Sequence, residues 1–420
     1  MKKNALSNEL RLILFCAAIG AVVGVVFWIF LFAVNKGTWL IWDLIPGRVL
    51  KFGWYPVLAC TLGGLLTGLF RRKNGDYPEE MTVVFAKLKQ NGTYPYRKIL
   101  VLLVAALLPL IFGSSVGPEA GMVGIVVALC CWAGENLRFA GSQSAYYSRV
   151  GASVSLSVLF RSPLFGILDE MEDEAAGNAA DGGRQPVSRP TKIAVYSVAP
   201  GAGFGAFWLM NTLLGKVSEG FPTFDIITLG AGDYALFILY LICGIALGLF
   251  FEVSEKLFEG IGHSLPPVVS ETLAGLILGV TASLLPVIRF SGEEQMGELI
   301  RDFALYAPLA MIGIAFLKIV MTNMCIQLGL KGGHFFPLIF AAVCMGYGVA
   351  LLFFPGDAAH ATFAAAVVAA ATLGVTMKKP LAVSVLLLLC FPVRSLLWIV
   401  PAAAIAGWAG NRIAGGKEAQ

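Results

Sequence analysis

The spacing of the charged residues constrains this chain of 420 residues more than any other feature. Nine runs of at least 17 residues contain no Asp, Glu, Lys or Arg: 12–35, 52–70, 99–118, 193–215, 234–251, 272–288, 332–356, 358–377 and 395–411. A charged side chain at the centre of a bilayer costs about 3 kcal/mol or more, and a helix needs about 20 apolar residues to cross the bilayer. The runs therefore predict an all-α, polytopic membrane protein.

Composition supports this fold class. Only 13% of the residues are charged, about half the proportion in an ordinary soluble domain. This excludes a water-soluble enzyme, a nucleic-acid binder and a disordered chain, and the net charge of +4 is too small to indicate a polyanionic partner. We therefore expect membrane lipid to surround the protein. The 48 glycines predict closely packed helices, for example at Gly20 with Gly24 and at Gly244 with Gly248.

Some apolar runs are too short to cross a membrane. Four of them predict segments that are half-spanning or re-entrant: 120–134, 150–160, 303–317 and 380–393. Such segments persist only where their ends are buried in protein or face a water-filled cavity. We therefore expect a polar site inside the membrane.

Basic residues mark the expected cytoplasmic side. They cluster before the first long run, after the second and after the last: Lys2, Lys3, Arg11, Arg71, Arg72, Lys73, Arg412 and Lys417. Because Lys and Arg favour the cytoplasmic ends of spans, both termini are expected in the cytoplasm. We expect a single transmembrane domain over 1–420, without a C-terminal cytoplasmic regulatory domain.

An internal repeat indicates where the site lies. The first passage is GSSVGPEA at 113–120. A Pro-Leu pair follows 45 residues after Pro118, and a basic and a polar residue stand directly before this pair. The passage GGHFFPL at 332–338 is followed, 43 residues after Pro337, by a second Pro-Leu pair after two lysines. Paired interrupted segments of this kind mark the binding site of many transporters. The repeat predicts two halves, about 10–220 and 225–415.

Both passages have the chemistry of an anion site. Glycines allow a tight turn, and proline is favoured in the first turn of a helix. The free N–H groups and the positive end of the helix dipole then attract an anion. Two such ends that converge would bind a small anion weakly enough to release it. A protonated His334 would add to this attraction, whereas a neutral His334 would be bonded to the helix end.

Other functions are weaker alternatives. The first alternative is that the two turns are ordinary starts of helices in a membrane bundle and bind nothing. A carrier of organic anions would need a larger cavity with polar side chains, whereas Val116, Phe335 and Phe336 suit a narrow path. An intramembrane hydrolase is the third alternative, and we expect no enzyme because the three histidines lie far apart in the sequence. We expect no cofactor and no metal, only a small anion as the transported ligand.

These residues resemble the CLC family of chloride channels and chloride/proton antiporters. GSSVGPEAG at 113–121 is similar to the family motif G-[KR]-E-G-P, and GGHFFP at 332–337 to G-x-F-x-P. FRSPLFGILDEMED at 160–173 is similar to the segment with P-L-x-G and a glutamate pair, and NGDYPE at 74–79 to a degraded G-S-G-I-P-E. The resemblance spans nearly the whole chain. It implies a homodimer in a prokaryotic plasma membrane, with one anion pore per subunit built from an inverted repeat of tilted and broken helices.

Val116 is the position at which this chain departs most from the pattern of the family that it resembles. In most of the family the residue before G-P is a glutamate that serves as gate and proton carrier, and valine can do neither. We therefore expect passive or weakly coupled anion flow. The alternative is a proton-coupled antiporter in which Glu119 is a displaced gate. An acid in a first helical turn can also simply stabilise the helix dipole.

The central anion ligands also differ from the family pattern. The family serine of G-S-G-I-P corresponds to Gly75, which can still offer its backbone N–H. Asp76 is expected to cap a helix that begins near Pro78 rather than to face an anion. The family tyrosine of the last helix is absent, because no tyrosine follows Tyr347.

An acidic cluster closes the third motif. Glu172 and Asp173 match the glutamate pair, whose second member is the inward proton site in coupled members. A proton path through Glu119, Glu172 and Asp173 is one hypothesis, and a solvated charge run before a loop is the alternative that we favour.

The candidate anion-binding residues are Gly75, Asp76, Tyr77, Val116, Gly117, Pro118, Glu119, Gly333, His334, Phe335 and Phe336. Chloride is the expected anion because it is the common substrate of the family, and fluoride or another anion stays an alternative.

Overall fold

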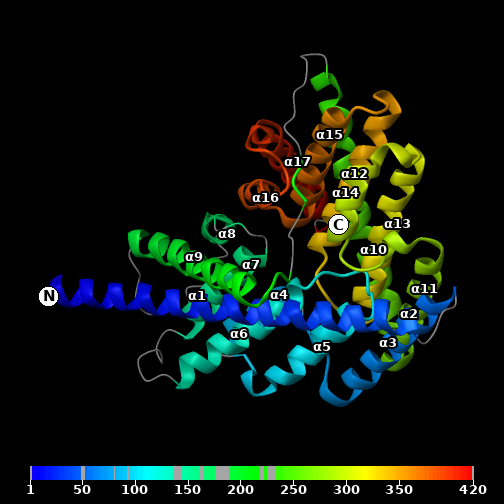
Figure 1. The fold of residues 1–420 in the computed structure, drawn as a ribbon. Helices are drawn as coiled ribbons and strands as arrows, with labels where there is room; N and C mark the ends of the chain where they lie inside the picture. The colour runs from blue at the N-terminus through cyan, green and yellow to red at the C-terminus, as the bar shows by residue number, and fades with distance from the viewer. Residues whose placement is uncertain are drawn as a thin grey trace.

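The chain folds almost entirely into helices (Figure 1). The computed structural model describes residues 2–48, 53–79, 81–91, 94–136, 144–159, 162, 164–175, 189–217, 222–224 and 233–418. Within these residues the only β-type pairing is one isolated bridge. The fold is all-α, as the sequence predicted.

We group the helices by the two halves that the sequence predicts, with the boundary near residue 225. Those of the first half are α1 (Lys2–Trp39), α2 (Ile45–Arg48), α3 (Tyr55–Asn74), α4 (Met81–Asn91), α5 (Ile99–Ile111), α6 (Glu119–Asn136), α7 (Ser144–Leu159), α8 (Phe165–Ala175) and α9 (Arg189–Leu214). Those of the second half are α10 (Phe237–Ser264), α11 (Pro267–Leu284), α12 (Glu293–Asp302), α13 (Pro308–Gln327), α14 (Phe335–Phe353), α15 (Ala358–Met377), α16 (Pro380–Leu387) and α17 (Leu396–Glu418). Short 3-10 or π turns join several of them.

Eight helical segments of the described chain are long and apolar enough to cross a membrane. The protein is therefore a multi-pass membrane protein. The most deeply buried of the eight are α14 and α15, which pack against each other at the centre of the second half. The expected half-spanning run 380–393 is confirmed, because α16 has only 8 residues and so reaches about 12 Å.

Two runs differ from their predictions. Residues 308–317 of the run 303–317 belong to α13, a full-length helix of 20 residues, because the charge of Lys318 lies inside the protein rather than in lipid. The first residues of the run, 303–305, form a separate 3-10 turn. The run 99–118 is not one continuous span. Its helix α5 ends at Ile111, and the rest forms a turn before α6.

Glycines let the main helix pairs approach closely. α1 runs along α9 through the first half (Figure 1), where a Cβ on Gly20 or Gly24 would lie 2.1 Å from a backbone oxygen of α9. Gly244 and Gly248 have the same role between α10 and α15. The packing that these spacings predicted is confirmed. α3 and α11 join the two halves in this way as well.

The α3–α11 crossing gives a test of close packing. A Cβ on Gly275 would lie 2.2 Å from the backbone oxygen of Cys60. We expect Gly275→Ala to destabilise the protein by about 1–3 kcal/mol, because neither backbone can move aside freely. The matched control is Gly205→Ala on α9, which has no atom within 4 Å. Thermal stability in detergent, followed by size-exclusion chromatography, should fall only for Gly275→Ala; equal stability of the two variants would contradict the prediction.

Candidate functional site

The two passages of the repeat meet in the structure. The N–H of Gly117 donates to the oxygen of Gly333 at 2.7 Å, and the N–H of Gly333 donates to the oxygen of Gly117 at 2.7 Å. This is the isolated bridge of the fold. In each half a helix begins two residues later, α6 at Glu119 and α14 at Phe335. The N-terminal ends of both helices are thus brought to one place.

The two turns are built alike. α5 and α13 are each followed, two residues after their last residue, by a glycine with positive φ, Gly113 at 84° and Gly329 at 103°. The next N–H reaches back over the last helical turn, from Ser114 to the oxygen of Pro109 at 3.0 Å in the first half and from Leu330 to that of Cys325 at 2.7 Å in the second. This bond and the left-handed glycine are the marks of a Schellman C-cap.

The side chain of Glu119 fills the junction. It is only 3% exposed, and its Oε1 accepts a hydrogen bond of 3.2 Å from the N–H of Phe336 in the first turn of α14. A Cβ on Gly117 or Gly333 would lie within 2.0 Å of Oε2, so a side chain at either position would displace the carboxylate from its place in the junction. Among the described residues Oε2 has no hydrogen-bond partner. The carboxylate therefore lies where the end of α14 attracts an anion.

Other predicted residues of the two turns support this junction. Val116 is fully buried and packs against Gly332, where a Cβ would lie 2.4 Å from its Cγ2. Pro118 precedes α6, and its oxygen accepts from the N–H of Met122 at 3.1 Å. His334 is the N-cap residue of α14, and its ring lies against Phe335 and Phe251 with centroid distances of 4.6 and 5.1 Å.

The segment 113–117 also fits the hydrolase pattern G-x-S-x-G, a match that our sequence interpretation did not include. Its serine, Ser115, is fully buried, and its hydroxyl lies 3.3 Å from that of Thr322. No histidine is recorded in contact with this hydroxyl in the described part of the chain.

Gly75 does not offer its backbone N–H to an anion. Gly75 ends α3 with a φ of 103°, and its N–H donates to the oxygen of Arg71 at 2.8 Å. The N–H of Tyr77 donates in turn to the oxygen of Gly75 at 3.0 Å. The expectation of a free N–H at Gly75 is therefore wrong, because the C-cap of α3 uses it.

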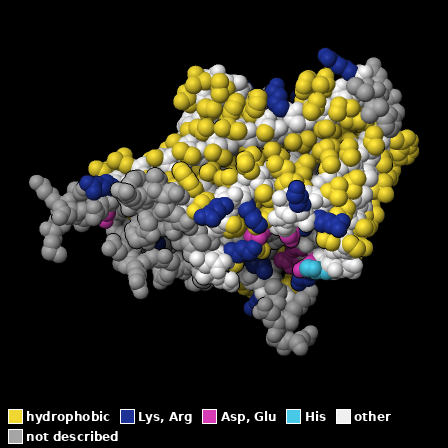
Figure 2. Space-filling model, turned by 90° about the horizontal axis from the view of Figure 1, so that it is seen from below, with side chains coloured by type: hydrophobic (Ala, Val, Ile, Leu, Met, Phe, Trp, Pro, Cys, Tyr) yellow, Lys and Arg dark blue, Asp and Glu magenta, His cyan; other side chains and the backbone are white. Residues whose placement is uncertain are grey.

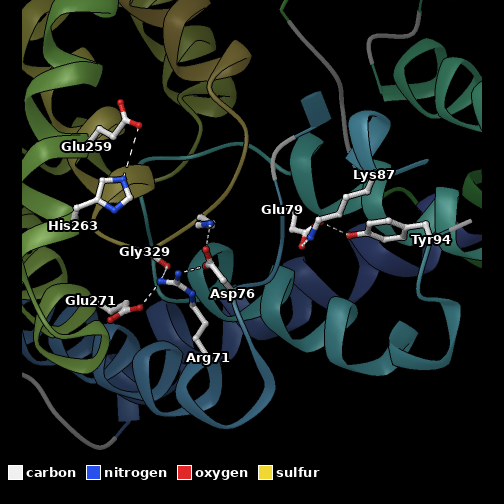
Figure 3. A network of polar contacts seen from close by, with 10 residues as sticks. Arg71, Asp76, Glu79, Lys87, Tyr94, Glu259, His263, Glu271 and Gly329 are labelled. Atoms are coloured by element: carbon white, nitrogen blue, oxygen red, sulfur yellow. Dashed lines mark hydrogen bonds and ion pairs between the residues drawn. The ribbon is translucent and has the colours of Figure 1, made fainter. Parts of the chain in front are cut away.

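Asp76 has a different role from the predicted cap. The described helix α4 begins at Met81, and the Asp76 carboxylate accepts from Arg71 and from Lys331, the latter at 2.7 Å. Arg71 also binds Glu271 of α11 and the oxygen of Gly329 (Figure 3). This network joins the end of α3 to α11 and to the linker before α14.

Charged side chains gather in one region of the described surface. Seen from below, hydrophobic side chains cover most of the face, and most of the acidic and basic side chains occupy one region (Figure 2). That division is typical of a membrane protein seen toward its water-exposed side.

Glu172 binds a second helix end. Its carboxylate accepts from the N–H groups of Leu381 at 2.8 Å and Ala382 at 2.7 Å, in the first turn of α16. Glu172 is therefore a capping ligand, and the interpretation as a solvated charge is wrong for this residue. The Asp173 side chain lies outside the described residues, and the proton path through the pair stays a prediction.

Comparison with known proteins decides the family. The model of the voltage gated chloride channel family matches residues 59–411. The chain belongs to this CLC family. The CLC chain is 27% identical over 318 residues to the voltage-gated ClC-type chloride channel ClcB of Shigella flexneri, covering 72% of the chain and 71% of the relative. ClcB of Escherichia coli O17:K52:H18 is 26% identical over the same coverage.

Solved CLC structures have the same fold. A slow cyanobacterial Cl−/H+ antiporter matches with a TM-score of 0.74 at 18% identity, covering 95% of this chain and 94% of the other. A CLC-type fluoride/proton antiporter matches with a TM-score of 0.70 at 19% identity, covering 95% of both. The family and fold that the motifs implied are confirmed, and they place the chain among channels and transporters.

The Asp76 contacts predict a pH-dependent stability. Partial burial by itself would raise the pKa of Asp76, but the Lys331 ammonium and the Arg71 guanidinium hold it below its ordinary value of 3.8. A lowered pKa contributes stability above about pH 4 that is lost as the pH falls further. The melting temperature should therefore decline below pH 4, and less so in Asp76→Asn. The effect is small because the side chain is largely exposed. An identical decline in both proteins would contradict this assignment.

Proposed function

We propose that this CLC protein moves small anions across the membrane along a path formed by the N-terminal ends of α6 and α14, and that Glu119 gates this path. The bond from Phe336 to the buried Glu119 carboxylate carries the proposal. An ionised carboxylate occupies the helix end at which an anion would otherwise bind. A proton removes its charge, so that the side chain can leave and an anion can take its place.

The sequence supports Glu119 in a second way. If Gly117 is aligned with the first glycine of G-[KR]-E-G-P, Glu119 falls on the glutamate of the motif. Our sequence interpretation aligned the proline instead, which gave the glutamate position to Val116. The Gly-x-Glu spacing is the signal in the sequence that supports Glu119 as the gate. It favours linked movement of anions and protons over passive flow.

The remaining features of the proposal rest on the family. Chloride is the anion that we propose, since the curated relatives are named chloride channels, and the fluoride/proton antiporter among the structures keeps fluoride as the alternative. We propose a homodimer in a prokaryotic plasma membrane, with cytoplasmic termini, one path per subunit and no cofactor. Light scattering of the purified protein tests the subunit number.

Glu119→Gln tests the gate. In liposomes, anion efflux through the natural protein should rise as the pH falls and drive proton uptake, because the ionised gate blocks the path. The variant should conduct with little pH dependence and without proton movement. Glu259→Gln, an exposed acid on α10, is the matched control and should behave like the natural protein. An unchanged rate and pH profile in Glu119→Gln would leave this residue only a structural role.

Efflux of different halides tests the anion. We expect chloride to leave loaded liposomes at least about tenfold faster than fluoride, a difference of about 1.4 kcal/mol in the barrier. The reason is that fluoride must lose its bound water more completely than chloride in order to pass, and helix ends bind a small anion without removing all of its water. Faster efflux of fluoride would overturn the assignment to chloride.

A further inference from the structure

Lys318 is a buried cation that the proposed gate does not use. It lies on α13 with 0% exposure, and its Nζ donates to the oxygens of Ile288 at 3.0 Å, Arg289 at 3.5 Å and Phe290 at 2.7 Å. An ammonium has three N–H donors, whereas a neutral amine has two donors and a lone pair. Three carbonyl acceptors around one nitrogen therefore indicate the charged form.

No carboxylate balances this charge directly. Among the described residues, no acidic oxygen lies within the 4.0 Å of an ion pair with Lys318. Its other neighbour is the ring of Phe340 on α14, with the nitrogen 5.5 Å from the ring centroid. Carbonyl dipoles and an aromatic face stabilise a cation without neutralising it. Its positive field therefore extends to the surrounding groups.

The segment that Lys318 holds reaches both turns of the site. The N–H of Phe290 donates to the oxygen of Gly113 at 3.3 Å, and Gly113 is the left-handed glycine of the first turn. Two residues after Phe290, Gly292 lies against Phe340. A Cβ on Gly292 would lie 2.7 Å from the Cβ of Phe340. Phe340 is one helical turn beyond Phe336, whose N–H binds the gate.

We infer that Lys318 is a positioning residue for the Glu119 gate: it holds the segment 288–290 under the first turn and supplies the fixed positive charge that favours an ionised gate or a bound anion. The inference rests on the proposed function and goes beyond it, because it assigns the electrostatic balance of the path to a group that does not touch the anion. A positive charge makes a nearby carboxylate harder to protonate.

Other titratable groups face the same junction. Glu293, the first residue of α12, carries a negative charge, whose effect on the gate is opposite in sign to that of Lys318. His334 lies at the N-terminus of α14 beside Phe335. A test must therefore change the charge of Lys318 while Glu293 and His334 stay in place.

Three variants separate charge from packing. Lys318→Met keeps the length and removes the charge, Lys318→Arg keeps the charge, and Leu309→Ala is a control on the exposed face of α13. We expect the pH of half-maximal efflux to rise by about one unit in Lys318→Met, on the order expected for loss of a unit charge in a low dielectric. The apparent KM for chloride should rise about tenfold. Lys318→Arg and Leu309→Ala should keep the pH midpoint of the natural protein.

The outcomes distinguish this inference from the proposed function. If Glu119→Gln does not flatten the pH profile, the proposed gate fails. If it does, but Lys318→Met keeps the natural midpoint, the inference about Lys318 alone is overturned. A shift in Lys318→Arg as large as that in Lys318→Met would also overturn it, since the charge is retained. Should the methionine variant not survive purification, Lys318→Gln, which still donates to the carbonyls, replaces it with the same expected shift.

Discussion

The paired hydrogen bonds between Gly117 and Gly333 are the contact on which the rest of the site depends. They fix the ends of two helices from different halves at one point, and both helices begin two residues beyond the bridge. A side chain at either glycine would collide with the Glu119 carboxylate. Close backbone contact and an intramembrane acid are thus parts of one arrangement, and neither half could build it alone.

Two helix ends of the second half are bound by acids of the first half. Glu119 lies at the start of α14, and Glu172 lies at the start of α16. The two differ in what surrounds them. Glu172 accepts with both oxygens and is partly exposed, whereas Glu119 is almost completely buried with one oxygen unpartnered in the described chain. Glu172 is therefore the better satisfied capping ligand of the two.

Sequence reasoning predicted the parts that depend on local chemistry. Gaps between charges predicted a multi-pass helical protein, and the repeated glycine turns predicted where the halves meet. It failed where tertiary contacts decide. Lys318 interrupted an apolar run but not its helix, because carbonyls from another segment solvate its charge. The N–H of Gly75 is used by a helix cap that no motif reveals. At the gate the motif can be aligned in two registers, one that gives the glutamate position to Val116 and one that gives it to Glu119, and the spacing alone does not choose between them.

The glycine turns have a mechanical consequence. The oxygen of Gly113 in the first half accepts from Phe290 of the second, and the oxygen of Gly329 in the second half accepts from Arg71 of the first. Each turn is therefore anchored by the opposite half as well as by the bridge between them. Such reciprocal anchoring resists rocking of one half against the other. Under the proposed function, the part that moves in a transport cycle is then the Glu119 side chain, and the backbone around it stays fixed.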